Sequence, residues 1–397
     1  MLPIVLLVIT SVLAQDPTIE PSVLIDVFGP PPATQATITT SPKLEDITVR
    51  PTDKNEFVDK NGDTCKCVPY YLCNDDLIGV DVNNASVTGF GVLDIRFGED
   101  ECQESVERCC TSPKEEKDVV IPARPLKGCG YRNPKGLDFT ITGGSGGEAE
   151  FGEFPWVVAL LNSMNESYIG VGVLIHPQVV MTGAHVVHNY GAGNLKIRAG
   201  EWDTQTTGER LKSVEKTVVD VTSHPEFQRK NLKYNVALLK LESPLELAEH
   251  INVICMPGQD ESFDQYKSCV ANGWGKDVFG LQGRYAVILK KVQVDMVPHT
   301  RCEAQLKKTR LGSKFRLHSS FVCAGGEEGK DTCQGDGGAP LACPIGGDRY
   351  KLTGLVSWGI GCGQKDVPAV YANVPMFRKW VDDKMAAWGY DISGYSV

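Results

Sequence analysis

Short apolar runs separated by Gly, Pro and Asn recur along the C-terminal two thirds of the chain. They occupy residues 156–161, 172–175, 236–239 and 352–356. Short strands at regular spacing over about 250 residues are typical of a β-barrel or β-sandwich. One helix is predicted near the C-terminal end, where apolar residues recur at three- and four-residue spacing: Phe377, Trp380, Val381, Met385 and Trp388.

The first apolar run, residues 1–14, has a different meaning. It is shorter than the ~20 residues that span a bilayer, and it ends in the small-residue pattern Val12-Leu13-Ala14. This pattern predicts a secretory signal peptide that is cleaved after Ala14. No later run reaches ~18 apolar residues, so we expect no membrane anchor. In a secreted chain, the two sequons predict glycosylation at Asn84 and Asn165.

Four further regions follow the signal peptide. Residues 15–63, rich in Pro, Thr and Asp, predict a flexible leader. Residues 64–111 are cysteine-dense, residues 112–140 form a Pro-containing linker, and residues 141–390 hold most of the β-rich runs. Within the cysteine-dense region, the pattern from Leu77 to Phe97 predicts two strands joined by a turn at Asn83-Asn84.

The cysteine-dense region follows the pattern Cys65-x-Cys67-x5-Cys73-x28-Cys102-x6-Cys109-Cys110. These spacings do not match a zinc knuckle, and no His lies nearby. In a secreted protein, a small domain held by disulfides is the better interpretation, although spacing alone does not choose the connectivity.

Charge separates the same regions. The chain has 50 acidic and 40 basic residues, a net charge of −10. Residues 15–128 contain 21 acidic and 11 basic residues, whereas residues 129–397 contain 29 of each. The acidic balance argues against a nucleic-acid partner and against docking on an anionic membrane.

Five motifs in the β-rich region carry a specific resemblance. They are Gly-Glu-Phe-Pro-Trp (152–156), Thr-Gly-Ala-His (182–185), Ala-Asn-Gly-Trp-Gly (271–275), Cys-Gln-Gly-Asp-Gly-Gly-Ala-Pro-Leu (333–341) and Val-Ser-Trp-Gly (356–359). Their order and separation resemble a trypsin-like serine protease domain, and the cysteine-dense unit resembles an arthropod clip domain. The resemblance implies an all-β, chymotrypsin-like double six-stranded barrel with a C-terminal helix, preceded by a clip domain.

The same resemblance implies that the catalytic site is disarmed. Acyl transfer in this family needs a hydroxyl nucleophile, an imidazole base and a carboxylate that orients it. By position, His185 is the base, Asn235 replaces the carboxylate and Gly337 replaces the nucleophile. A glycine cannot attack a carbonyl, and loss of the carboxylate alone costs about 10⁴ in rate in a related protease. The oxyanion donors of the family would be the N–H groups of Gly335 and Gly337.

Other functional positions of the family are altered as well. Thr140 precedes Ile141-Thr142-Gly143-Gly144, so a trypsin-like activating cut is not expected there, and Asp336 is expected to lack its ammonium partner. Asp331 falls at the base of the specificity pocket, and Ala369 replaces a wall glycine. The bridge beside the catalytic His is absent, because Val186 and Gly170 occupy its positions.

The resemblance also implies a pairing for all 14 cysteines. In the clip-like unit it implies Cys65–Cys109, Cys67–Cys102 and Cys73–Cys110. In the barrels it implies Cys269–Cys343, Cys302–Cys323 and Cys333–Cys362, and Cys129–Cys255 ties the linker to them. No cofactor is expected. Glu201 and Glu209 loosely resemble a calcium loop, but a solvated acidic loop is the favoured interpretation.

A scaffold without its nucleophile is best interpreted as a binding surface. The resemblance implies a secreted, haemolymph cofactor of melanisation, whose partners would be prophenoloxidase and an upstream clip-domain protease. Its acidic region would dock a partner, and it could form a homo-oligomer after cleavage. The first candidate cleavage site is Arg96, and the second is Lys60. The alternatives are an active trypsin-like endopeptidase and a microbial-surface recognition or clotting-adhesion protein.

Overall fold

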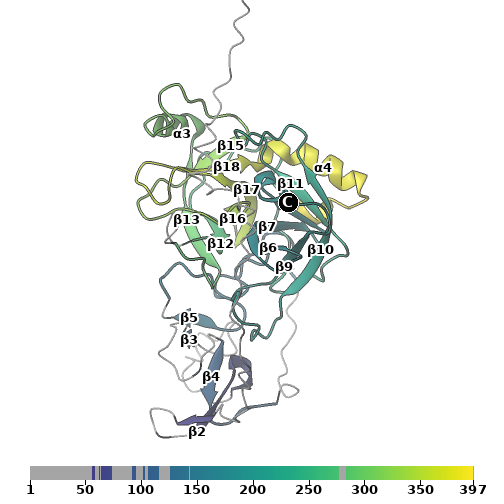
Figure 1. Cartoon of the computed structure of the whole chain (residues 1–397), viewed down its shortest axis with the longest axis vertical. Coiled ribbons are helices and arrows are strands. Elements are labelled where there is room, and N and C mark those ends of the chain that lie inside the picture. Colours follow the sequence, from purple (N-terminus) through teal and green to yellow (C-terminus); the bar gives the residue numbers. More distant parts are fainter. Residues whose placement is uncertain are drawn as a thin grey trace, which may run out of the picture.

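The computed structural model describes residues 56–58, 62, 64–73, 92–94, 102, 106–115, 126–142, 144–276 and 283–396. Figure 1 shows two adjacent sheets in the upper part of the molecule and a small sheet at its lower end. The predicted all-β architecture is confirmed. Among the described residues, no helix is both long and apolar enough to cross a membrane.

The cysteine-dense, clip-like unit is built on a three-stranded antiparallel sheet with the order β1-β2-β4. Its strands are β1 (Glu56–Val58), β2 (Thr64–Pro69) and β4 (Glu107–Cys110), and a 3-10 turn, η1 (Tyr70–Leu72), follows β2. The sheet is too small to bury a large core, and disulfides typically stabilise such domains. Each of its three disulfides has at least one cysteine in β2 or β4.

The first barrel is closed, with the strand order β10-β11-β8-β7-β6-β9. Its strands are β6 (Val157–Asn162), β7 (Tyr168–His176), β8 (Val179–Thr182), β9 (Leu195–Ala199), β10 (Val214–Ser223) and β11 (Ala237–Leu241). In β9, Leu195, Ile197 and Ala199 are buried, while the side chains between them are partly exposed. This alternation is the pattern that places one face of a strand in a core.

The second sheet has the order β13-β12-β16-β17-β18-β15-β14. Its strands are β12 (Cys269–Gly273), β13 (Lys290–Val294), β14 (Met296–Val297), β15 (Phe321–Ala324), β16 (Pro340–Gly346), β17 (Arg349–Trp358) and β18 (Ala369–Asn373). Only Asp295 separates β13 from β14, so the two ends of the sheet are one continuous stretch of chain. The sheet therefore curls back on itself as a second six-stranded, barrel-like unit.

Short helices close the barrels. They are α2 (Ala184–Val187), α3 (His299–Leu306) and α4 (Arg378–Ala387), with 3-10 turns η5 (Val374–Phe377) and η6 (Ser393–Tyr395). The predicted terminal helix is α4, which buries Val381 and Met385. Helix α3 was not predicted, because it buries only Cys302 and Leu306 and so has a weak apolar period.

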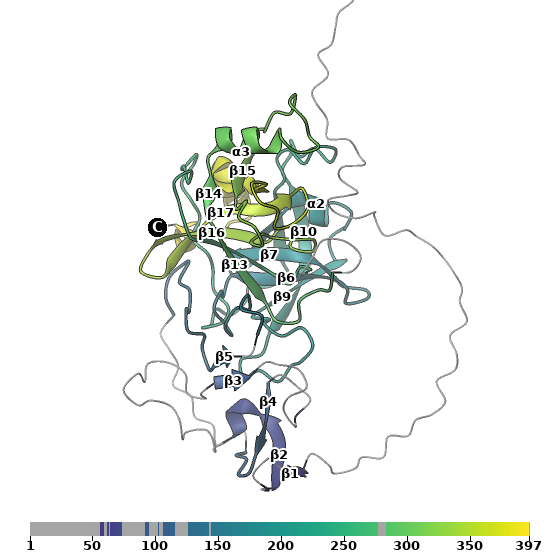
Figure 2. The same ribbon diagram turned by 90° about the vertical axis from the view of Figure 1, so that its left-hand side faces the viewer.

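A two-stranded parallel sheet joins the clip region to the protease-like region (Figure 2). Strand β3 (Val92–Asp94) pairs with β5 (Thr140–Thr142), with Leu93 opposite Ile141. Strand β3 falls in the second of the two strands predicted between Leu77 and Phe97. The turn predicted at Asn83-Asn84 lies outside the described residues, as do the signal peptide and most of the leader.

Candidate functional site

The site lies where the two barrels meet. His185 is on α2, directly after β8, and Asn235 precedes β11, so both come from the first barrel. Gly337 precedes β16 of the second barrel. The fold therefore brings together three residues that are far apart in the sequence.

The Asn235 side chain is held in one orientation. Its Oδ1 accepts the backbone N–H of His185 at 2.9 Å. Its Nδ2 donates to the buried Ser357 hydroxyl at 2.7 Å and lies 2.8 Å from His185 Nδ1. Because an amide nitrogen can only donate, His185 Nδ1 must act as the acceptor, and the ring proton is then on Nε2. A carboxylate at this position would select the opposite tautomer.

The His185 ring is therefore a poor base for a nucleophile at position 337. Burial of the ring lowers its pKa to about 4, and the hydrogen bond with Asn235 only partly opposes this. The ring is neutral at physiological pH, and its Nε2 already carries a proton. It has no lone pair with which to accept a proton from a hydroxyl group on that side.

Gly337 occupies the position from which a nucleophile would face the base. A Cβ atom added to Gly337 would lie 3.0 Å from His185 Nε2 and 3.2 Å from Val186 Cγ2. Gly337 therefore leaves the space directly in front of the imidazole without a side chain. A Cβ atom added to Gly170 would lie 2.8 Å from Val186 Cγ1, so the two positions at which we expected the bridge to be absent also face each other.

The loop that would hold the oxyanion donors is tied to its surroundings. The carbonyl of Gln334 accepts the Lys276 N–H at 2.7 Å, and the carbonyl of Gly335 accepts the Tyr168 hydroxyl at 2.9 Å. Gly335 has φ = +102°, and a Cβ there would lie 2.6 Å from the Tyr285 ring. Glycine is therefore required at position 335 by both backbone conformation and close packing.

Asp336 takes its hydrogen bonds from the backbone. Its oxygens accept the N–H groups of Gly275 at 2.8 Å and Cys333 at 2.9 Å, and burial of the carboxyl group raises its pKa to about 6. The Ile141 N–H instead donates to the Glu150 side chain at 2.9 Å, and Ile141 itself pairs with Leu93 in the β3–β5 sheet. The segment that would carry the activating ammonium is thus held in strand pairing with the clip region.

The two residues expected in the specificity pocket line different cavities. Ala369 and Gly337 line a cavity of about 40 Å³, whereas Asp331 and Asp336 line an open cavity of about 1040 Å³. Asp331 accepts the N–H groups of Thr332 and Gly363, and burial raises its pKa to about 6. A cavity of about 40 Å³ has room for only a few water molecules. The cavity beside Gly337 is therefore small compared with an Arg or Lys side chain.

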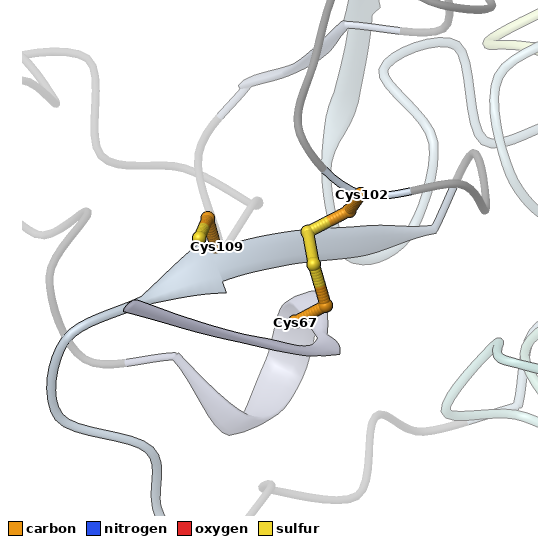
Figure 3. Close-up of side chains that lie close together, drawn as sticks. All are labelled: Cys67, Cys102 and Cys109. Carbon is orange, nitrogen blue, oxygen red and sulfur yellow. A yellow bond between two sulfur atoms is a disulfide. The ribbon is translucent and has the colours of Figure 1, made fainter. Parts of the chain in front are cut away.

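The acidic loop is buried, contrary to the solvated loop that the sequence favoured: Glu201 and Glu209 are both buried. Glu201 accepts a hydrogen bond from Arg198 at 3.0 Å, and Glu209 accepts one from the Asp203 N–H at 3.3 Å. Within the described part of the chain, the one group of His, Cys, Asp and Glu side chains close enough to share an ion is Cys67, Cys102 and Cys109. Figure 3 shows why that group is not a metal centre: Cys67 and Cys102 form a disulfide, and Cys109 is bonded to Cys65.

The structure contains seven disulfides, and they join the same seven pairs that the resemblance implies. In the clip domain these are Cys65–Cys109, Cys67–Cys102 and Cys73–Cys110. In the rest of the chain they are Cys129–Cys255, Cys269–Cys343, Cys302–Cys323 and Cys333–Cys362.

The candidate modification sites are only partly described. Arg96, Lys60 and Asn84 lie outside the described residues. Asn165 is exposed in the turn between β6 and β7, where its side chain accepts hydrogen bonds from Ser167. Its position is open to glycosylation.

Sequence reasoning missed two features. Ser357 lies in the motif Val-Ser-Trp-Gly (356–359), but nothing in the sequence predicts that its hydroxyl group contacts Asn235. The second feature is a buried contact between domains: the Tyr70 hydroxyl donates to Asp138 at 2.7 Å, and Arg210 donates to both Asp138 oxygens at 2.6 and 2.9 Å. Tyr70 also packs edge-on against Phe139. No local sequence pattern predicts this contact, because Tyr70, Asp138 and Arg210 are distant from one another in the sequence.

The two barrels, the site between them and the disulfide-rich N-terminal sheet define a clip-domain serine protease homologue. The chain matches the trypsin family over residues 143–381 and the serine protease clip domain family (PPAF-2) over residues 54–111, and it belongs to the trypsin family.

Three known proteins are similar to this chain in sequence. It is 48% identical to phenoloxidase-activating factor 2 of Galleria mellonella, over 70% of this chain and 98% of that protein. It is 38% identical to the inactive CLIP domain-containing serine protease A8 of Anopheles gambiae, over 80% and 87% of the two chains. It is also 38% identical to the inactive CLIP domain-containing serine protease A3 of Aedes aegypti, over 82% and 68%. Two of these names describe inactive proteases, which supports a non-catalytic protein.

Proposed function

We propose that this protein is a secreted, non-catalytic cofactor of a prophenoloxidase-activating protease cascade. The observation that carries the proposal is the disarmed site: Gly337 offers no nucleophile to His185, and Asn235 holds the imidazole in the wrong tautomer. The folded barrels, the disulfides and the clip domain are nevertheless all present. A scaffold of this kind can bind a partner but cannot form an acyl-enzyme.

The name of one relative supports a role in the prophenoloxidase pathway. A relative that is 48% identical is named a phenoloxidase-activating factor. We therefore propose prophenoloxidase and an upstream clip-domain protease as partners. The acidic clip region supplies the docking surface, because the net charge of −10 is confined to residues 15–128.

We further propose that a cut after Arg96 activates the cofactor, with a cut after Lys60 as the second choice. Arg96 lies two residues beyond β3, the strand that pairs with β5. A cut there would free one end of the strand that ties the clip region to Ile141.

Reconstitution with purified proteins tests this function. Prophenoloxidase and an active clip protease are mixed with wild type, with Arg96→Gln or with Lys60→Gln, and phenoloxidase activity is measured. We expect activity to require the protein, and to be lost with Arg96→Gln but retained with Lys60→Gln. Full phenoloxidase activity without the protein would contradict the proposal, and so would hydrolysis of an Arg-amide substrate by the purified chain.

A further inference from the structure

The protease-like region is neutral only as an average. Residues 129–397 contain 29 acidic and 29 basic residues. Two segments of this region, residues 226–234 and 299–318, together contain nine basic and two acidic residues, so their net charge is +7 and the remainder carries −7. We call the surface of these two segments, the second of which includes α3, the basic face. Its cations are Arg229, Lys230, Lys233, Arg301, Lys307, Lys308, Arg310, Lys314 and Arg316.

The two segments form one surface. Leu232 of the first segment and Leu306 and Leu317 of the second belong to the same buried cluster. Tyr234 packs edge-on against His318, with ring centres 5.3 Å apart. The cations on both sides of this contact therefore lie on a continuous part of the surface.

Most of these cations face solvent and are not balanced by nearby acids. Seven of the nine are exposed, and Lys233 and Lys307 are half-buried. Glu303 accepts hydrogen bonds from both Lys307 and Arg316, so its one carboxylate is shared by two cations. The second acid of the basic face is Glu226. Concentrated charge of one sign attracts a partner of the opposite sign and raises its local concentration.

The basic face offers no exposed apolar anchor. In the described part of the chain, the large apolar side chains that are exposed all lie outside the two segments: Leu126, Met164, Val214, Val219 and Tyr285. Interfaces with folded proteins depend mainly on a few aromatic and apolar anchors that become fully buried. This surface therefore fits a polymer that binds through its charges better than it fits a folded protein.

A row of aromatic rings borders the cations. Tyr234 stacks on His224 with ring centres 5.4 Å apart, and His224 contacts Trp380 at 5.1 Å. His318 lies against Tyr234 as well. All four side chains are half-buried, so part of each stays accessible. Such side chains combine an apolar body with a polar group, and the apolar face of a sugar ring can lie against a surface of this kind.

The chemistry of the cations favours sulfate groups. Four of the seven exposed cations are arginines, whose guanidinium groups pair with tetrahedral oxyanions through two parallel N–H donors. A net charge of +7 on two short segments also matches a polymer with more than one negative charge on a sugar. Sulfation gives a polysaccharide that charge density.

We propose that the basic face binds a sulfated polysaccharide, with sulfate groups paired to the exposed Arg and Lys side chains and sugar rings beside Tyr234. This binding site goes beyond the proposed function and does not rest on it. Figures 1 and 2 show α3 and the β1-β2-β4 sheet at opposite ends of the molecule. A polymer on the basic face therefore leaves the clip domain free for other partners.

Heparin is the probe, and titration calorimetry with the purified full chain measures its affinity. Binding is measured at about 150 mM salt and at several higher concentrations, because salt screens exposed charges. The basic-face variant is Arg301→Gln, Lys308→Gln, Lys314→Gln. A second variant changes the other segment: Arg229→Gln, Lys230→Gln. The matched control removes three charges at exposed lysines outside the basic face: Lys135→Gln, Lys212→Gln, Lys267→Gln.

We expect wild type and the control to bind heparin with the same affinity at about 150 mM salt. The basic-face variant should bind at least about tenfold more weakly, and the second variant at least about threefold. The dependence of log Kd on log salt should also flatten in both variants, because fewer counterions are released. Circular dichroism checks folding, and the second variant carries the test should the first unfold.

Two further probes test the chemistry of the ligand. Heparin stripped of its sulfate groups should bind wild type at least about tenfold more weakly, because it lacks most of the charge. Inorganic polyphosphate of similar length should also bind at least about tenfold more weakly, because it has no sugar rings to contact the aromatic row.

The opposite results overturn the proposal. Absence of heparin binding by wild type at about 150 mM salt excludes the site, and an equal loss in the control and the basic-face variant excludes its location. Equal affinity for heparin and polyphosphate overturns the assignment to a polysaccharide. These measurements need no component of the cascade, so their failure and the failure of phenoloxidase reconstitution are distinguishable.

Discussion

Restoring the nucleophile by Gly337→Ser should leave the protein unable to form an acyl-enzyme. A Cβ at this position lies 3.0 Å from His185 Nε2, so a hydroxyl group reaches the imidazole after a shift of a few tenths of an ångström. The obstacle is the proton on that nitrogen. Because Asn235 Nδ2 donates to Nδ1, Nε2 is a donor and cannot take the hydroxyl proton.

The wrong tautomer of His185 should slow the reaction by several orders of magnitude. Replacement of the carboxylate by an amide costs about 10⁴ in rate in a related protease, through the same change of tautomer. That factor corresponds to about 5.5 kcal/mol of transition-state stabilisation. The double variant Gly337→Ser, Asn235→Asp should therefore react about 10³–10⁴ times faster than Gly337→Ser alone.

A small fluorophosphonate probe is the suitable assay, with labelling followed by intact mass. The probe needs no specificity pocket, which matters because the cavity beside Gly337 is only about 40 Å³. Gly337→Ala is the control without a hydroxyl group, and Asn235→Asp is the control without a nucleophile. Turnover of an Arg-amide peptide should stay absent even in the double variant. Equal labelling of Gly337→Ser and the double variant would refute the tautomer argument.

Three further outcomes are expected. Tyr70→Phe removes the hydrogen bond to Asp138 and should lower the free energy of unfolding by about 1.5–3 kcal/mol in a denaturant titration; an equal loss in the exposed control Tyr285→Phe would contradict this. Burial, together with two neighbouring carboxyl groups, raises the pKa of Glu209 to about 7 from 4.5, so the native state holds a proton that the unfolded chain releases, and stability falls as the pH rises through this window. Glu209→Gln should therefore gain stability over wild type by up to about 3 kcal/mol between about pH 5 and pH 8, whereas a similar gain in the exposed control Glu226→Gln would show that the effect is not specific. Mild reduction should open the clip disulfides before Cys269–Cys343 and Cys302–Cys323, because each clip disulfide has one half-buried cysteine while both cysteines of these two barrel disulfides are fully buried; simultaneous alkylation of both sets, measured by mass spectrometry, would count against this order.

Much of the fold was predictable because its signals are local. Apolar runs bounded by turn residues predicted strands that the structure contains, such as β6, β7, β11 and β17. Helix α3 was missed because only two of its side chains are buried. The pairing of β3 with β5 was missed because it joins segments 48 positions apart, Val92 to Thr140, that have no common pattern.

In the candidate site too, some features were predictable from local sequence and others were not. The motifs alone led us to expect Gly337 at the position of the nucleophile and Asn235 at the position of the carboxylate. That Asp331 and Ala369 line different cavities could not be predicted, because cavity shape depends on how the loops pack.

The sequence alone determined that this chain has no hydroxyl nucleophile at position 337, because glycine lacks a side chain in any fold. It also determined where the charge and the cysteines are concentrated along the chain. Only the tertiary structure decided which way the Asn235 amide faces and which strand pairs with the segment that carries Ile141. The physical reason is that each of these depends on contacts between residues distant in the sequence, and packing of the folded chain sets those contacts.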